Sequence, residues 1–281
     1  MKEIALKIGN PTPLTAIVNT PKKIDPTKPA VLILNSGVMH HVGTCRLSVK
    51  IARELAKSSI LSIRFDFSGI GDSENRSGTQ SFHETSIAEI TEVMDYLENK
   101  RGISKFIVYG LCSGADASYD IALVDKRIFA MVQIDPYCYR TWKWYIRHYG
   151  PRLLNLQTWV NFVSRHLNIQ AKTLGFSESV DKDNLEVASY AREFPPRDEI
   201  SSGLTALVNR HFHMYTIITG SQSEIINHNS QFRESFSDVN FEGLLTVEYY
   251  PKMDHIITNP AYQQIVIDNI CRWINQVIKN D

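Results

Sequence analysis

The chain has 281 residues, of which 43% are hydrophobic and 21% charged, with 30 basic and 30 acidic side chains. A net charge of zero gives no ground for a nucleic-acid partner, and no stretch is apolar for long enough to cross a bilayer. The four cysteines lack the spacing of a metal site and indicate reduced thiols. We therefore expect one large cytoplasmic α/β domain with an insertion and with no metal or cofactor.

Hydrophobic patterning predicts strands that alternate with helices along the first half of the chain. Residues 3–8 and 14–19 alternate apolar and polar side chains, which favours an antiparallel pair of strands at a sheet edge. The predicted elements that follow are strand 30–34, helix 46–57, strand 60–65, helix 86–99, strand 106–109, a helix to about residue 124, and strand 128–134. Strands that alternate with helices build a parallel sheet.

The alternation stops after residue 134 and resumes near residue 214. Residues 137–205 are rich in Tyr, Trp, Arg and Leu, with a predicted helix around residues 156–167, and we interpret them as a helical cap. Strands 214–219 and 244–249 and an amphipathic helix over 262–278 then complete the pattern. The prediction is a mostly parallel central sheet flanked by helices, with residues 1–136 and 206–281 as the core.

A cysteine between two glycines follows the predicted strand 106–109. The pentapeptide Gly110-Leu111-Cys112-Ser113-Gly114 is typical of a nucleophile elbow, a strained turn that presents a nucleophile between a strand and a helix. The positive end of the helix dipole favours a thiolate at this position. The alternative interpretation is a buried cysteine in a glycine-rich turn.

A thiol nucleophile needs a base, and the base needs a carboxylate to orient it. His255 lies in the loop after the last predicted strand, where hydrolase folds carry their histidine. The acid has two candidates: Asp135 directly after strand 128–134, which we favour, and Glu224 shortly after strand 214–219. The third alternative is that the histidine has no acid partner. The alternative for Asp135 is a residue that only ends a strand and begins a turn.

An oxyanion hole requires two backbone N–H groups. We expect them at Ser113, after the nucleophile, and at Val38, in the turn after strand 30–34. Possible contacts to the substrate are Met39, Trp142, Tyr145 and Trp159.

The first part of the predicted cap is strongly basic. Residues 136–176 contain six Lys or Arg residues and no Asp or Glu, interleaved with Trp and Tyr. This composition suits the docking of an acidic acyl or peptidyl carrier protein outside and an apolar acyl chain inside. A solvated basic face over a buried aromatic face explains it equally well, and association with a membrane surface is a third interpretation.

Together these residues resemble the α/β-hydrolase superfamily and, within it, the exosortase-A-system-associated hydrolases. The matching stretches are residues 43–46, 64–73 (RFDFSGIGDS), 110–115, 148–149, 152–153 and 253–255. That family carries Asp where Gln222 stands and Asn where Asp135 stands. The relocated acid implies a triad Cys112–Asp135–His255, which is similar to that of the cysteine-dependent Dieckmann cyclases.

The chemistry of a thiolate narrows the reaction. A thiolate that attacks an ester or amide is the better leaving group, whereas exchange with a thioester is nearly balanced. We therefore expect a small-molecule acyl thioester or activated ester to acylate Cys112, followed by hydrolysis. Cyclisation or transfer to another acceptor is the second hypothesis, favoured if the cap excludes water. A non-catalytic binding protein on the same scaffold is the third.

Overall fold

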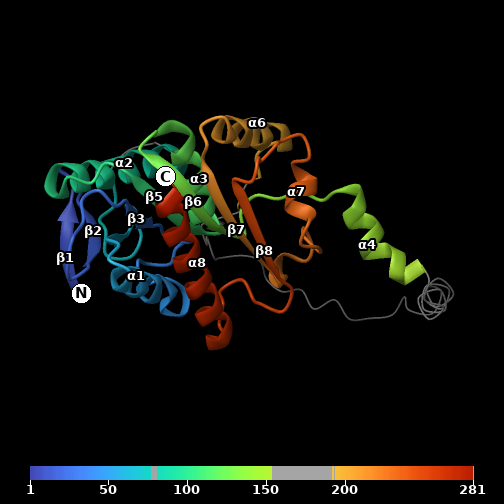
Figure 1. Ribbon diagram of the computed structural model, residues 1–281, viewed down its shortest axis with the longest axis horizontal. Coiled ribbons are helices and arrows are strands. Elements are labelled where there is room, and N and C mark those ends of the chain that lie inside the picture. The colour runs from blue at the N-terminus through green and yellow to red at the C-terminus, as the bar shows by residue number, and fades with distance from the viewer. Residues whose placement is uncertain (77–80, 154–191, 193, 281) are drawn as a thin grey trace, which may run out of the picture.

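The computed structural model describes residues 1–76, 81–153, 192 and 194–280, which form an α/β-hydrolase fold around an eight-stranded sheet (Figure 1). The strand order is β1-β2-β4-β3-β5-β6-β7-β8. The strands are β1 (Lys2–Ile8), β2 (Leu14–Thr20), β3 (Ala30–Ile33), β4 (Ser62–Phe65), β5 (Phe106–Leu111), β6 (Ile128–Ile134), β7 (His213–Thr219) and β8 (Leu245–Tyr250).

The sheet is mostly parallel, as predicted. The five pairs from β4 through β3, β5, β6 and β7 to β8 are parallel. β1 pairs antiparallel with β2, and β2 pairs antiparallel with β4, which confirms the predicted pair at the edge. The carboxyl ends of the parallel strands therefore meet at one edge of the sheet, where ligand sites of open α/β sheets lie.

Helices cover both faces of the sheet. One face carries α1 (Leu47–Lys57) and α8 (Pro260–Asn280), and the other carries α2 (Phe82–Arg101), α3 (Ser113–Val124) and α6 (Arg197–Val208) (Figure 1). Shorter elements are η1 (Thr44–Arg46), η2 (Gly220–Gln222), α4 (Trp142–Leu153) and α7 (Gln231–Ser235). Within the described part of the chain, none of the helices has the length and apolar character needed to cross a membrane.

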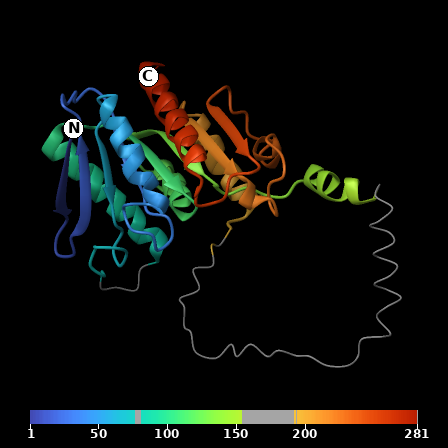
Figure 2. The same ribbon diagram turned by 90° about the horizontal axis from the view of Figure 1, so that it is seen from below.

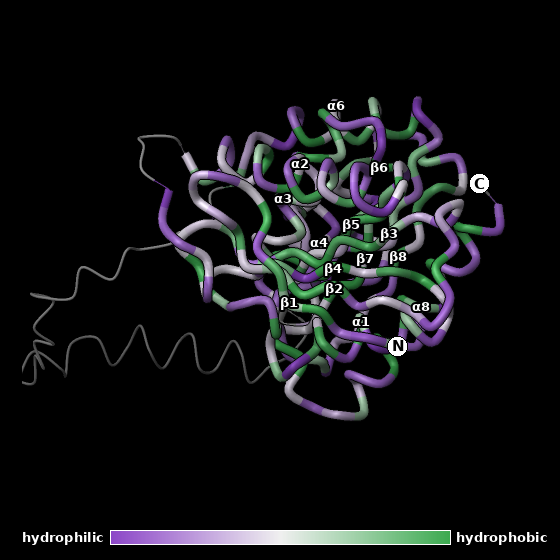
Figure 3. Tube along the Cα trace, turned by 90° about the vertical axis from the view of Figure 1, so that its left-hand side faces the viewer, coloured by the Kyte–Doolittle hydropathy of each residue, from purple (hydrophilic) through white to green (hydrophobic). Residues whose placement is uncertain are grey.

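Successive side chains of a strand point to opposite faces of the sheet, so one sheet contributes to a hydrophobic core on each face. Val31 and Ile33 of β3 pack with α1 and α8, whereas Ala30 and Leu32 pack with α2, α3 and α6. All four side chains are buried, so β3 is hydrophobic on both faces. Figure 3 shows hydrophobic residues along the strands in the middle of the molecule.

The described part of the predicted cap contains α4 and α6, while the helix predicted over 156–167 lies outside the described residues. α4 stands apart from the sheet, at the β8 end of the molecule (Figures 1 and 2). α6 instead packs against α3, where Tyr119 Oη donates to the carbonyl of Ile200 at 3.2 Å. Ile200 and Leu204 are buried in the core. Because α6 is a core helix, we propose that the inserted cap ends before Arg197 rather than at residue 205.

Candidate active site

Cys112 occupies the turn between β5 and α3 with φ 55° and ψ −119°, a conformation that a non-glycine residue rarely adopts. The flanking glycines make this turn possible. A Cβ at Gly110 would overlap the carbonyl of Gly114, and a Cβ at Gly114 would overlap the carbonyl of Asn35. Strand, strained turn and helix therefore have the geometry of a nucleophile elbow.

Asp135 follows β6 at the same sheet edge and is fully buried. Its carboxylate accepts a hydrogen bond from His255 Nδ1 at 2.6 Å. The backbone N–H and the hydroxyl of Thr219, at the end of β7, donate to it at 2.7 Å each. These three donors supply hydrogen bonds to the buried carboxylate and fix its orientation toward the imidazole.

His255 lies in the loop that follows β8, and two hydrogen bonds hold that loop against η2. The N–H of His255 donates to Ser221 Oγ at 2.9 Å, and the N–H of Gly220 donates to the carbonyl of Met253 at 2.9 Å. A Cβ at Gly220 would overlap the carbonyl of Pro251, so the close approach of the two segments requires glycine there. The imidazole is thereby placed between Asp135 and Cys112.

The electrostatics of this group favour a thiolate beside an imidazolium. The hydrogen bonds with Asp135 and then with Cys112 raise the pKa of His255 to about 10, although burial opposes the charge. Burial also disfavours ionisation of Cys112, but the hydrogen bond with His255 and the charges of Arg192 and His255 bring the pKa of the thiol below its ordinary value. Cys112, His255 and Asp135 thus form one hydrogen-bonded series.

Glu224, the alternative acid, lies elsewhere. Its side chain is exposed, and its backbone carbonyl accepts a hydrogen bond from Arg140 Nε at 2.6 Å. In the described part of the chain, the carboxylate that pairs with His255 is that of Asp135. The geometry therefore favours Asp135 of the two candidates.

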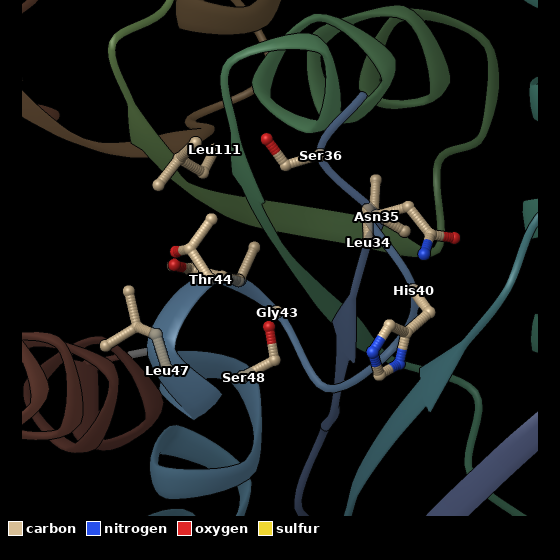
Figure 4. A pocket seen from close by; sticks show the side chains of 10 residues that line it. Leu34, Asn35, Ser36, His40, Gly43, Thr44, Leu47, Ser48 and Leu111 are labelled. Atoms are coloured by element: carbon tan, nitrogen blue, oxygen red, sulfur yellow. The ribbon is translucent and has the colours of Figure 1, made fainter. Parts of the chain in front are cut away.

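The loop with the expected second oxyanion donor lies directly beside the elbow. The N–H of Gly37 donates to Ser113 Oγ at 2.6 Å, and the N–H of Met39 closes the turn onto the carbonyl of Ser36 at 3.0 Å. Val38 is at the tip of that turn, with an exposed side chain. A small pocket lies between this loop, Leu111 and the start of α1 (Figure 4). The loop therefore lines a small pocket next to the elbow.

Asp66 anchors the loop of residues 35–41 by hydrogen bonds to Asn35 and His41. No pattern in the sequence assigns it that role. It is fully buried and accepts hydrogen bonds from the Asn35 amide at 3.0 Å, from the backbone N–H of His41 at 2.5 Å, from His41 Nδ1 at 2.7 Å and from the N–H of Asp72 at 3.0 Å. Burial opposes ionisation, but these bonds keep the pKa of the carboxyl below its usual value.

His41, Asp66 and Asp72 also bring three ligand atoms within 4.8 Å of one another, the kind of group that can hold a metal. Here the four hydrogen bonds already occupy the acceptor sites of the Asp66 carboxylate. We therefore assign Asp66 to the support of residues 35–41. Asp66 lies in residues 64–73, a stretch that carries the resemblance to hydrolases but gives Asp66 no role of its own.

The expected substrate contacts on the cap are less clearly placed. Trp142 and Tyr145 lie on α4 with 68% and 47% of their surfaces exposed, and Trp159 lies outside the described residues. Met39 is 40% exposed in the loop beside the elbow. Contact with the substrate stays a prediction for all four residues.

The basic side chains of α4 are partly engaged within the protein. Arg147 forms two hydrogen bonds with Glu234, at 2.6 and 2.9 Å, and Lys143 lies 3.5 Å from the same carboxylate. These ion pairs reduce the free positive charge that the composition of residues 136–176 indicates.

Comparisons with known proteins identify the fold. A family model described as serine aminopeptidase, S33, matches residues 26–204, which include Cys112 and Asp135. The esterase PF2001 of Pyrococcus furiosus has a similar structure, with a TM-score of 0.60 and 14% identity over 98% of this chain and 90% of that one. Est1E from Butyrivibrio proteoclasticus gives a TM-score of 0.59 and 14% identity, over 98% of this chain and 99% of that one.

A proline iminopeptidase of Mycobacterium smegmatis is similar at a TM-score of 0.58 and 14% identity, with 99% of both chains covered. No curated protein matches the sequence. At this level of identity the structural likeness establishes the fold, and the chemistry must be inferred from the side chains of this chain. The principal departure is visible at once, because the family is named for a serine enzyme and the elbow here carries Cys112.

Proposed function

Because the chain belongs to the serine aminopeptidase S33 family of α/β-hydrolases, we propose that it is an acyl-transfer enzyme in which Cys112 is acylated and then released by hydrolysis. The observation that carries the proposal is the hydrogen-bonded series from the strained Cys112 through His255 to the buried Asp135. A structural cysteine would need neither a charged imidazole nor a buried carboxylate behind it.

Acylation begins with attack of the Cys112 thiolate on the carbonyl carbon of an acyl thioester. The backbone N–H groups of Ser113 and Val38 then stabilise the negative charge on the carbonyl oxygen. The imidazolium of His255 gives its proton to the departing thiol as the carbon–sulfur bond breaks. The products of this step are a free thiol and an acyl group joined to Cys112 as a thioester, with a neutral His255.

Deacylation reverses the role of the histidine. Neutral His255 accepts a proton from a water molecule while the water oxygen attacks the acyl carbon. Collapse of the tetrahedral intermediate releases the carboxylic acid and restores the thiolate beside the imidazolium. Asp135, hydrogen-bonded to His255 Nδ1, stabilises the imidazolium form that each cycle regenerates.

A thioester substrate can be tested directly against an oxygen ester of the same acyl group. We expect kcat/KM to be about ten times higher or more for the thioester, because its leaving group is matched to the Cys112 thiolate. Steady-state turnover of both esters of one acyl group, with release of the free acid recorded, provides the measurement. Equal or better turnover of the oxygen ester would remove the reason for a thioester substrate.

A Dieckmann-type cyclase or acyltransferase is the second candidate. It is favoured by the place of the acid, at the end of β6 rather than β7, because the cysteine-dependent cyclases that the sequence resembles share this layout. We also infer kinship with the exosortase-A-system-associated hydrolases from residues 43–46, 64–73, 110–115, 148–149, 152–153 and 253–255. Identification of the product as a ring or a transferred acyl group, rather than a free acid, would select this candidate.

A carrier-linked substrate is a finer proposal. The basic composition of residues 136–176 suits an acidic carrier, although Lys143 and Arg147 are paired with Glu234 and Arg140 Nε donates to the carbonyl of Glu224. Comparison of the pantetheine thioester with the carrier-linked thioester of the same acyl group separates recognition of the acyl group from recognition of the carrier.

A further inference from the structure

Arg192 precedes α6 in the chain and lies near the elbow, where hydrogen bonds and aromatic rings fix its guanidinium. Nε and Nη2 donate to the two carboxylate oxygens of Asp116 at 2.7 and 2.5 Å, and Nη1 donates to the backbone carbonyl of Asp135 at 3.0 Å. The group also lies 5.0 Å from the ring centres of both Tyr137 and Phe194. This fork of hydrogen bonds and ring contacts fixes the position of the charge.

Asp116 is an unusual neighbour for a thiolate. It lies in the first turn of α3, four positions after Cys112, and its side chain is only 10% exposed. Burial raises the pKa of its carboxyl to about 6, in spite of the hydrogen bonds from Arg192. A buried negative charge at this distance along the helix disfavours a second negative charge on Cys112. The elbow therefore needs a compensating cation.

The charged groups around Cys112 come from four elements. His255 lies in the loop after β8, Asp135 follows β6, Asp116 lies on α3, and Arg192 precedes α6. With the thiolate included, these groups carry three negative and two positive charges. Asp120, one turn further along α3, adds a carboxylate that pairs with His83 of α2 at 2.8 Å. Without Arg192, the cluster would hold three negative charges against the single imidazolium.

We propose that Arg192 is a positioning residue of the active site, which cancels the charge of Asp116 and maintains the Cys112 thiolate while it binds the backbone of the catalytic acid. The inference deepens the proposed function and rests on Cys112 as its nucleophile. Asp116 and Arg192 carry opposite charges beside Cys112, so the removal of each has the opposite effect on the ionisation of the Cys112 thiol.

The test is the pH dependence of Cys112 alkylation by iodoacetamide, followed by the mass of the peptide that contains Cys112. In Arg192→Met the midpoint of alkylation moves upward by about one pH unit, because a neighbouring cation is lost. In Asp116→Asn it moves downward, because the guanidinium is no longer neutralised. The double variant lies close to the wild type.

Arg210→Met is the matched control. Arg210 also joins α3 to β6, through the carbonyls of Ala122 at 2.6 Å and Ile128 at 2.8 Å, but at the ends of these elements that lie away from the elbow. Its loss leaves the midpoint unchanged.

The possible results distinguish a failure of the role proposed for Arg192 from a failure of the proposed Cys112 thiolate. Shifts in the same direction for Arg192→Met and Asp116→Asn, or no shift in either, overturn the role of Arg192 and leave the nucleophile intact. If Arg192→Met does not fold, the downward shift in Asp116→Asn still supports the inference, and an unchanged midpoint there overturns it. A wild-type midpoint equal to that of an ordinary cysteine overturns the proposed thiolate itself.

Discussion

Replacement of Asp135 by asparagine is expected to lower kcat about 10³- to 10⁴-fold while the fold is retained. The amide has nearly the same shape as the carboxylate, but it carries no charge and offers one acceptor oxygen to donors that now use both. His255 would lose the largest contribution to its raised pKa and with it the reason to stay protonated beside Cys112. Steady-state turnover gives the measurement.

The pH profile of the same variant identifies the mechanism of the loss. In the wild type the thiolate–imidazolium pair forms as pH rises through the lowered pKa of Cys112 and is lost as pH passes about 10, where His255 loses its proton. In Asp135→Asn the alkaline limb of kcat/KM moves to lower pH, toward the ordinary pKa of histidine.

Glu224→Gln is the matched control for the acid, because it neutralises the alternative carboxylate on an exposed side chain. We expect this variant to keep nearly full activity. A large loss in Glu224→Gln together with a small loss in Asp135→Asn would assign the acid to Glu224 instead.

Replacement of Cys112 by serine is expected to lower turnover about 10³-fold or more, and replacement by alanine to abolish it. A serine hydroxyl is too weak an acid to ionise in a site arranged for a thiolate, and the charged imidazolium is then unable to accept its proton. Steady-state turnover of the thioester, with far-UV circular dichroism to confirm the fold, provides the measurement.

The other cysteines provide controls. Cys45 is exposed, whereas Cys138 and Cys271 are buried, and burial raises the pKa of each buried thiol to about 12. Serine at position 45 should therefore leave turnover unchanged. Near-full turnover by Cys112→Ser would show that the reaction does not need the thiolate.

The fold and the elbow could be predicted because their signals are local in the sequence. The fully buried β5 is an apolar run in the sequence, and the glycines at positions 110 and 114 correspond to two close backbone approaches at the elbow. Asp135 directly follows predicted strand 128–134, and His255 lies in the loop after predicted strand 244–249. Both could be expected at one edge because parallel strands end at the same edge of a sheet.

The remaining site residues could not be predicted, because their partners are distant in the sequence. Arg192 pairs with Asp116 across 76 positions, and Asp66 contacts the loop of Asn35 across 31 positions. Two of the four donors to the Asp66 carboxylate are backbone N–H groups, which residue type cannot reveal. In α4 the aromatic and basic residues and the internal Pro151 obscure helical periodicity, so the sequence pattern does not predict this helix.

The acyl-enzyme is the most direct test of the central claim that Cys112 is the nucleophile. Wild-type protein is mixed with an acyl thioester, quenched in acid within milliseconds to seconds, digested, and mapped by mass spectrometry. A transient acyl group on the peptide that contains Cys112, absent from Cys112→Ala, is the predicted result. An acyl group on a different residue, or continued turnover by Cys112→Ala, would contradict it.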